Sequence, residues 1–336
     1  MAKINLLELE ETGMTGSLAG QKALIFGGNS LGKTFQSAKM PKPLLLMTEA
    51  GGNGVKCKKL PVNKWATFKD VVKQLTDEKT LDQMKEEYFT IIIDTLENLV
   101  GLAEQSVCTE FGVRDLSEIS GKQNGYSIYR KDFKTQVNKL CSCGYFVLFI
   151  DHEEIVELED PISGNKYNFV QPKGSGNIKS STRFVRDMCD FTFYAFGGEV
   201  DENGDAIPST LLCKQTKHAF ARSRYAIQTF VKPFTAKNLE DAIIKAIEKS
   251  ANDEGANLSD WKPNTTDYTA QDWIDMIKPY YKAIYKKDSE KAKAIVENEL
   301  GPGTKISEAT NEQKMELENI YNQMVTHACD MGLVVE

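Results

Sequence analysis

A short glycine-rich segment, G-G-N-S-L-G-K-T at residues 27–34, constrains the fold more than any other part of the chain. It fits the phosphate-binding pattern G-x-x-x-x-G-K-[ST], in which glycines let consecutive backbone N–H groups converge on one anion. An apolar run at residues 23–26 precedes the segment, and a helix is predicted from Lys33 to about Lys39, before Pro41. Strand, glycine loop and helix are the context that this motif requires, so an α/β fold with a phosphate at a helix N-terminus is expected. The alternative is a glycine-rich turn that binds nothing.

The fixed positions of this pattern have expected roles in binding a nucleotide. Lys33 should reach the β- and γ-phosphates, and the Thr34 hydroxyl should take one coordination position of Mg²⁺. A later apolar run ends at Asp94, whose carboxylate should lie beside the same ion unless it only caps the strand. ATP and Mg²⁺ are therefore the predicted cofactors. The expected nucleotide contacts are Gly27, Gly28, Asn29, Ser30, Leu31, Gly32, Lys33 and Thr34, and the expected metal ligands are Thr34 and Asp94.

Three further apolar runs predict a parallel sheet. They cover residues 43–48, 89–94 and 145–151, and each is continuous rather than alternating, as in strands that are buried on both faces. Helical segments lie between these runs, so right-handed crossovers are expected. A fourth run at 190–196 and hairpins over 192–228 complete the predicted core.

Charge and composition divide the chain into a core, residues 1–250, a linker, 251–264, and an acidic helical domain, 265–336. From residue 251 onward there are 16 acidic and 9 basic residues, which account for the whole formal charge of −7. The sequence contains no run of about 18 apolar residues, so no membrane-spanning helix is predicted. No signal peptide is recognisable. Seven cysteines at irregular spacing favour reduced thiols, so we expect a cytoplasmic protein without a membrane partner.

Many P-loop ATPases have a glutamate directly after the aspartate of this strand, and that glutamate activates water for hydrolysis. Here Thr95 follows Asp94, so another residue has to activate the water. Glu49 ends the strand after the P-loop helix. We expect that strand to lie next to the P-loop strand, so that the carboxylate orients water against the γ-phosphate. Glu97 is the rival base. His152 follows the next strand, where it either contacts the γ-phosphate or caps the strand.

These segments together resemble the RecA-type ATPase core, and most of all the phage AAA-family nucleotide-binding proteins related to RecA-like single-strand annealing proteins. The resemblance covers residues 18–235 and rests on G-G-N-S-L-G-K-T, L-L-L-M-T-E-A-G-G, I-I-I-D-T-L-E-N-L, F-I-D-H-E-E and K-H-A-F-A-R-S-R-Y. It implies a RecA-like P-loop NTPase core, a mostly parallel sheet flanked by helices, here with a small C-terminal helical domain. In that family a glutamate at the position of Glu49 activates water. The family often has Gln where this chain has His152.

Two acid-free segments predict contact with single-stranded DNA. Residues 121–131 and 163–186 combine basic side chains, which neutralise phosphates, with aromatic rings, which stack on bases. A solvated hairpin or a subunit contact is the alternative explanation. The candidate residues are Lys122, Tyr126, Arg130, Lys131, Lys166, Tyr167, Phe169, Lys173, Lys179 and Arg183.

The alternating sequence Arg222-Ser-Arg224 is expected to place both guanidinium groups on one face of the last core strand. RecA-like assemblies complete the ATP site with a cation from the neighbouring subunit, and arginine can stabilise transition-state charge there. A head-to-tail contact of this kind gives rings or filaments. Ordinary surface charge is the alternative.

The sequence therefore predicts an ATP-binding RecA-like ATPase that acts on single-stranded DNA in phage-type recombination or annealing. A homo-oligomer is expected, located in the cytoplasm of the bacterial host if a phage encodes the chain. A single-strand-binding protein and other recombination proteins are further candidate partners. The alternatives are a ring-forming helicase or loader motor on the same core, and a nucleotide-dependent scaffold with little hydrolysis.

Overall fold

The computed structural model describes residues 13–49, 54–119, 124–198, 200, 202, 207–262 and 268–333. The chain divides into two compact units, one over residues 12–263 and the other including residues 264–336. Of the described helices, none is long and apolar enough to cross a membrane.

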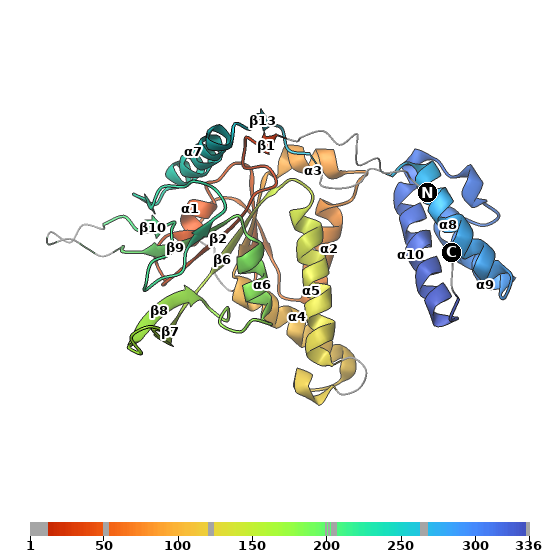
Figure 1. Cartoon of the computed structure of the whole chain (residues 1–336), viewed down its shortest axis with the longest axis horizontal. Coiled ribbons are helices and arrows are strands. Elements are labelled where there is room, and N and C mark those ends of the chain that lie inside the picture. The colour runs from red at the N-terminus through yellow and green to blue at the C-terminus, as the bar shows by residue number, and fades with distance from the viewer. Residues whose placement is uncertain are drawn as a thin grey trace. The chain divides into compact units, whose positions relative to one another are not determined.

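A mostly parallel sheet forms the centre of the larger unit (Figure 1). In the order β12-β10-β9-β2-β6-β5-β3-β4, the strands from β9 to β4 run parallel, whereas β10, β11 and β12 run antiparallel to their neighbours. The strand before the glycine loop, β2, therefore lies between β9 and β6. The strands are β2 (Lys22–Gly27), β3 (Pro43–Met47), β4 (Lys58–Pro61), β5 (Thr90–Asp94), β6 (Phe146–Asp151), β9 (Phe191–Phe196), β10 (Thr210–Leu212), β11 (Arg222–Ser223) and β12 (Phe230–Val231).

Helices cover both faces of this sheet and create two buried apolar clusters. Ile91 and Ile93 of β5 belong to one cluster and Ile92 to the other, which explains why the strand sequence is continuously apolar. Helices α2, α4, α5 and α6 cover the first face, and α7 covers the second. The predicted α/β fold is confirmed. The helices of this unit are α1 (Lys33–Ser37), α2 (Trp65–Leu75), α3 (Leu81–Glu87), α4 (Leu96–Phe111), α5 (Gly125–Cys141), α6 (Ser181–Met188) and α7 (Ala236–Glu254).

Two short pairings lie outside the central sheet. β7 (Glu153–Glu159) and β8 (Lys166–Pro172) form an antiparallel hairpin that follows β6. β1 (Met14–Thr15) pairs in parallel with β13 (Leu258–Ser259). Because α7 continues to Glu254 and β13 pairs with β1, residues 251–254 and 258–259 of the segment 251–264 that was predicted as a linker are regular structure of the larger unit.

The smaller unit packs three helices around its own core. They are α8 (Ala270–Tyr285), α9 (Ser289–Leu300) and α10 (Lys314–Asp330). Ile277, Ile284, Leu317, Ile320 and Met324 are fully buried between them. α8 begins at the capping box of Thr269 and Asp272, in which each residue's side chain binds the other's backbone N–H.

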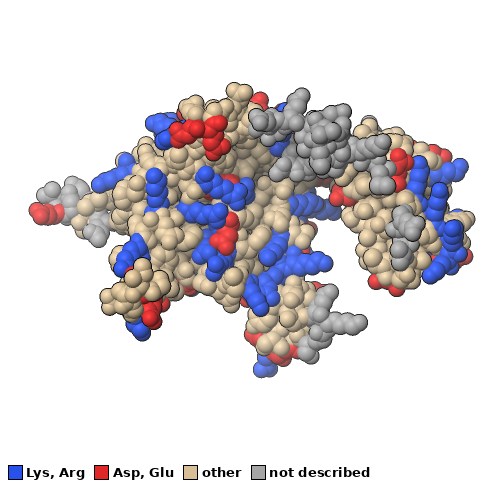
Figure 2. Space-filling view, in the orientation of Figure 1, with Lys and Arg blue, Asp and Glu red and all other residues tan. Residues whose placement is uncertain are grey.

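Basic side chains gather in two places on the face that Figure 2 shows. One group lies over α5 and α6 of the larger unit, and the other lies along one side of the smaller unit. The smaller unit is therefore not uniformly acidic, although its segment of sequence carries the net negative charge.

The packing of α5 predicts a large cost for removing Phe133, whose ring is fully buried and stacks 5.7 Å from that of Trp65. Phe133→Ala should lower the free energy of unfolding by about 3–5 kcal/mol. Phe111→Ala is the matched control and should change it by about 0.5 kcal/mol, because Phe111 is 48% exposed. Urea unfolding followed by tryptophan fluorescence measures both. Equal losses of unfolding free energy in Phe133→Ala and Phe111→Ala would contradict this packing of α5.

Candidate functional site

The carboxyl ends of neighbouring parallel strands meet at one edge of the sheet and enclose a cavity of about 420 Å³. Ligands bind at this edge in open α/β sheets because the loops that follow parallel strands converge there. Residues 29–35, from the glycine loop into α1, form one wall. Glu49 after β3, Asp94 of β5 and His152 after β6 contribute to the others. Four segments that are distant in sequence thus surround one space.

Two positions of the glycine loop have a backbone conformation that residues other than glycine rarely adopt. Gly27 and Gly32 have φ angles of 150° and 77°, and a Cβ at Gly27 would lie 2.3 Å from the carbonyl oxygen of Ala195. Lys33 Nζ donates hydrogen bonds to the carbonyl oxygens of Gly27 (2.8 Å) and Gly28 (2.6 Å). The loop therefore places an ammonium group at its own centre.

Burial changes the acid–base behaviour of Lys33, which is 8% exposed. Desolvation lowers the pKa of its ammonium group, whereas the nearby carboxylates of Asp94 and Glu153 oppose this effect. Glu153 lies at the start of β7, and its side chain is close to Gly28. It also binds the hydroxyl of Tyr194, whose pKa is raised to about 12 chiefly by burial. Sequence reasoning assigned no role to Glu153.

Thr34 and Asp94, the two predicted metal ligands, are in direct contact. The Thr34 hydroxyl donates a hydrogen bond of 2.6 Å to Asp94 Oδ2. Burial raises the pKa of the Asp94 carboxyl, and the hydrogen bond from Thr34 opposes this. Both side chains line the cavity beside Lys33. Mg²⁺ prefers hard oxygen ligands, so this donor set fits the ion, and Thr34 and Asp94 would hold it next to the glycine loop.

Glu49 reaches the same cavity from a strand that was wrongly expected to lie next to β2. β3 pairs with β4 and β5, so β5 and β6 separate it from the strand before the glycine loop. Strand order depends on how the crossovers pack and not on the order of strands in the chain. Glu49 is exposed, and its Oε2 accepts a hydrogen bond of 3.1 Å from Asn98 Nδ2.

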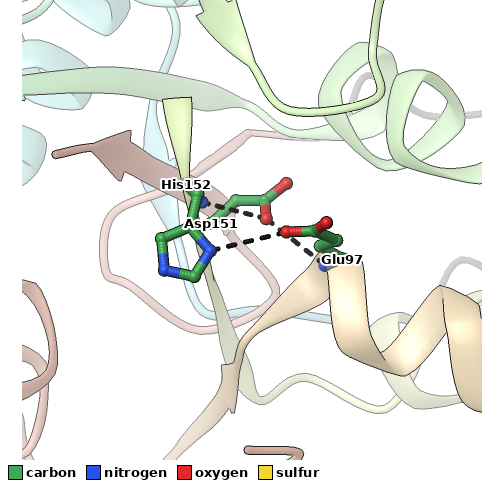
Figure 3. A group of neighbouring side chains, drawn as sticks. All are labelled: Glu97, Asp151 and His152. Carbon is green, nitrogen blue, oxygen red and sulfur yellow. Dashed lines mark hydrogen bonds and ion pairs between the residues drawn. The ribbon is translucent and has the colours of Figure 1, made fainter. Parts of the chain in front are cut away.

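Glu97, the rival base, is engaged elsewhere (Figure 3). Its Oε1 lies 2.8 Å from Lys173 Nζ, and its Oε2 lies 3.5 Å from His152 Nδ1. The carboxylate thus connects the tip of β6 to the segment after β8. His152 lines the cavity, whereas Glu97 is not among the lining residues.

Asp151 is a buried acid that sequence reasoning did not single out, although it lies in the quoted stretch F-I-D-H-E-E. Its Oδ1 accepts hydrogen bonds from the backbone N–H groups of His152 (3.0 Å) and Glu97 (3.3 Å). Its Oδ2 is buried without a hydrogen-bond partner among the described residues. Burial raises the pKa of this carboxyl to about 8, so it is mostly protonated at neutral pH. One potential ligand atom from each of Asp151, Glu97 and His152 lies within 4.8 Å of the other two, a spacing that could hold a cation. However, the ammonium group of Lys173 already neutralises the Glu97 carboxylate.

The two segments predicted to be DNA-contacting loops are largely regular structure. Residues 125–131 form the first turns of α5, and 163–186 includes β8 and most of α6. The two segments do meet, because Arg130 Nη1 donates a hydrogen bond of 3.2 Å to the carbonyl oxygen of Lys179. Together they form a surface, called here the α5–α6 surface, that includes Tyr126, Arg130, Lys131, Lys179 and Arg183.

The remaining predicted DNA-binding residues are less available. Phe169 is buried, so it is not free to stack on a base. Lys166 pairs with Glu157 (2.6 Å) and Lys173 pairs with Glu97. Tyr167 packs against His218, with Lys217 over its ring. Lys122 lies outside the described residues.

Arg222 and Arg224 both reach the end of α6, although β11 includes only Arg222 and is not the last strand, since β12 follows it. Arg222 Nη1 donates a hydrogen bond of 3.0 Å to the carbonyl oxygen of Asp187, and Arg224 Nη2 donates one of 3.3 Å to that of Met188. Both acceptors are at the end of α6. β11 pairs with the start of β9, and β9 starts beside the start of β2. The two arginines are therefore at the edge of the sheet opposite to the glycine loop of their own subunit.

Comparison with known proteins agrees with this geometry. Residues 19–225 match the AAA domain family, a match that spans the glycine loop, Asp94, His152 and Arg224. The chain is also 33% identical over 308 residues to the SPbeta prophage-derived uncharacterized protein YorG of Bacillus subtilis (strain 168). The aligned region covers 88% of this chain and 90% of that relative. The predicted AAA-type nucleotide-binding character is confirmed. The chain belongs to the AAA domain family, which implies nucleotide binding.

Proposed function

We propose that this chain is a Mg²⁺-dependent ATPase with a RecA-like core, which acts on single-stranded DNA in phage-type recombination or annealing. The observation that carries the proposal is the convergence of Lys33, Thr34, Asp94 and Glu49 from three strand ends on one cavity. The similarity to a prophage-derived protein supports the phage setting. We further propose that the working form is a head-to-tail homo-oligomer in the bacterial cytoplasm.

In the proposed reaction, water attacks the γ-phosphorus of ATP and the bond to the β–γ bridging oxygen breaks. Backbone N–H groups of the glycine loop and the Lys33 ammonium would neutralise the phosphate oxygens. Bound Mg²⁺ would withdraw further charge from the β- and γ-phosphates. Glu49 would orient the attacking water and accept its proton.

Two observations favour Glu49 over Glu97 as this base. Glu49 lines the cavity, whereas Glu97 does not. Both oxygens of Glu97 are already in contact with basic side chains, because Oε1 lies beside Lys173 Nζ and Oε2 lies beside His152 Nδ1. The Glu97 carboxylate is occupied by these contacts, whereas Glu49 is exposed and accepts a hydrogen bond from the neutral amide of Asn98.

The assignment of the base is tested by matched glutamine substitutions. Glu49→Gln should leave ATP binding nearly unchanged and lower kcat at least ~100-fold, because only the proton acceptor is removed. Glu97→Gln should keep most of the turnover, and Lys33→Ala should abolish nucleotide binding. Phosphate release measures turnover, and binding of a fluorescent ATP analogue measures affinity. Normal turnover in Glu49→Gln with loss in Glu97→Gln would assign the base to Glu97.

The α5–α6 surface supports the proposed contact with single-stranded DNA. Lys131 and Lys179 are exposed, and no carboxylate of the described residues pairs with either. Tyr126 is 41% exposed beside Arg130, so a ring is available for stacking on a base. The surface lies on the face of the sheet opposite to α7.

Removing two of these charges should weaken DNA binding without affecting the fold. Lys131→Ala/Lys179→Ala should bind a labelled oligo(dT) about tenfold more weakly at low salt, and the slope of log affinity against log salt should fall by roughly 2. Lys214→Ala/Lys245→Ala is the control, because it removes two exposed lysines near α7. Fluorescence anisotropy across a salt series measures both. Equal affinities of the two double variants would reject the α5–α6 surface as the DNA site.

The position of Arg222 and Arg224 supports action on the nucleotide of a neighbouring subunit, because both lie far from their own glycine loop. Arg222→Ala/Arg224→Ala protein and Lys33→Ala protein should each be inactive. Mixing them should restore part of the ATPase activity at interfaces that combine an intact loop with intact arginines. A mixture that co-assembles, as measured by sedimentation, but stays inactive would contradict this proposal.

A further inference from the structure

The smaller unit contains a cavity that the proposed ATPase does not use. Its volume is about 520 Å³, and it lies between α8, α9 and the segment 303–307. Ile274 and Val296, both buried, and Tyr281 and Ile306, both half-buried, supply an apolar lining. A concave apolar surface of this size accommodates one or two large side chains.

Lysines surround this apolar lining. Lys278 and Lys282 extend from α8, Lys293 from α9 and Lys305 from the segment after α9, and all four are exposed. Glu297 is an acidic residue at the same rim. Among the lining residues the lysines outnumber the one acid, so the rim is positive, although the sequence from residue 251 onward is negative as a whole.

Local sequence and pairing explain why this charge is available. Residues 278–293 contain six lysines and two acidic residues. Lys278 pairs with Asp275 (2.8 Å) and Lys305 lies 3.9 Å from Glu308. Lys282 and Lys293, in contrast, form no ion pair with a carboxylate in the part of the chain that the structure describes.

We propose that this cavity binds an acidic peptide segment of a partner protein that carries one large apolar side chain. The apolar side chain would fill the space between Ile274, Val296 and Ile306, and the carboxylates on either side of it would meet Lys282 and Lys293. Charge complementarity sets the position of the peptide and burial of the apolar group supplies affinity. A polynucleotide fits this site less well, because Ile274, Val296 and Ile306 are aliphatic and Tyr281 is the one aromatic ring among the lining residues, whereas single strands bind to successive aromatic rings.

This binding is independent of nucleotide hydrolysis, so it is tested on full-length protein with a defined probe. The probe is a fluorescein-labelled peptide, Asp-Asp-Glu-Phe-Asp-Glu, and fluorescence anisotropy measures its affinity. Lys282→Glu/Lys293→Glu should weaken binding about tenfold or more, because two attractive contacts become repulsive. Lys286→Glu/Lys287→Glu is the matched control, since it reverses the same charge at the end of α8 outside the cavity. Circular dichroism verifies that both variants remain folded.

Three outcomes would overturn the proposal. Equal weakening by the two double variants would mean that the peptide senses only overall charge. Equal affinity for a peptide with serine in place of phenylalanine would mean that the apolar cavity takes no part. Loss of oligo(dT) binding without loss of peptide binding in Lys282→Glu/Lys293→Glu would assign the surface to nucleic acid. Lys33→Ala protein should bind the peptide normally, which separates this result from any failure of the ATPase proposal.

Discussion

The parallel pairing of β2, β6, β5 and β3 is the constraint on which the candidate site depends. Parallel strands end at the same edge, so one geometric rule brings the glycine loop, His152, Asp94 and Glu49 around a single cavity. The two apolar clusters maintain this pairing because each strand is covered on both faces. A loss of packing on either face would therefore move several functional groups together.

Within that frame, buried polar groups keep the site in a defined arrangement. The ammonium of Lys33 is held by two carbonyl oxygens of its own loop, and Asp94 is held by Thr34. Asp151 holds the tip of β6 against the start of α4 through two backbone N–H groups. Such groups lose solvation when the chain folds, so hydrogen bonds and opposite charges have to compensate. An incoming phosphate would offer Lys33 a stronger partner than the carbonyl groups do.

The contacts of Glu97 show how the cavity is connected to the surface of the larger unit. Glu97 joins His152, at the cavity, to Lys173, which begins the segment leading to Lys179 and α6. Arg130 joins that segment to α5. The proposed nucleotide and DNA sites are thus connected by these polar contacts and by the segment 173–179 that lies between them in the chain.

The sequence by itself determined the class of fold and the glycine loop, because these depend on local patterns: glycines where the backbone has a positive φ, and apolar runs where strands are buried. It also indicated Glu49, Asp94 and His152, because each directly follows or ends an apolar run. Only the tertiary structure decided which strands are neighbours, so the expected adjacency of β3 and β2 was wrong. It also decided that Phe169 is buried, that Lys173 neutralises Glu97, and that lysines of an acidic segment gather around one cavity. Those facts depend on contacts between residues far apart in the chain, and such contacts cannot be predicted from net charge or residue spacing.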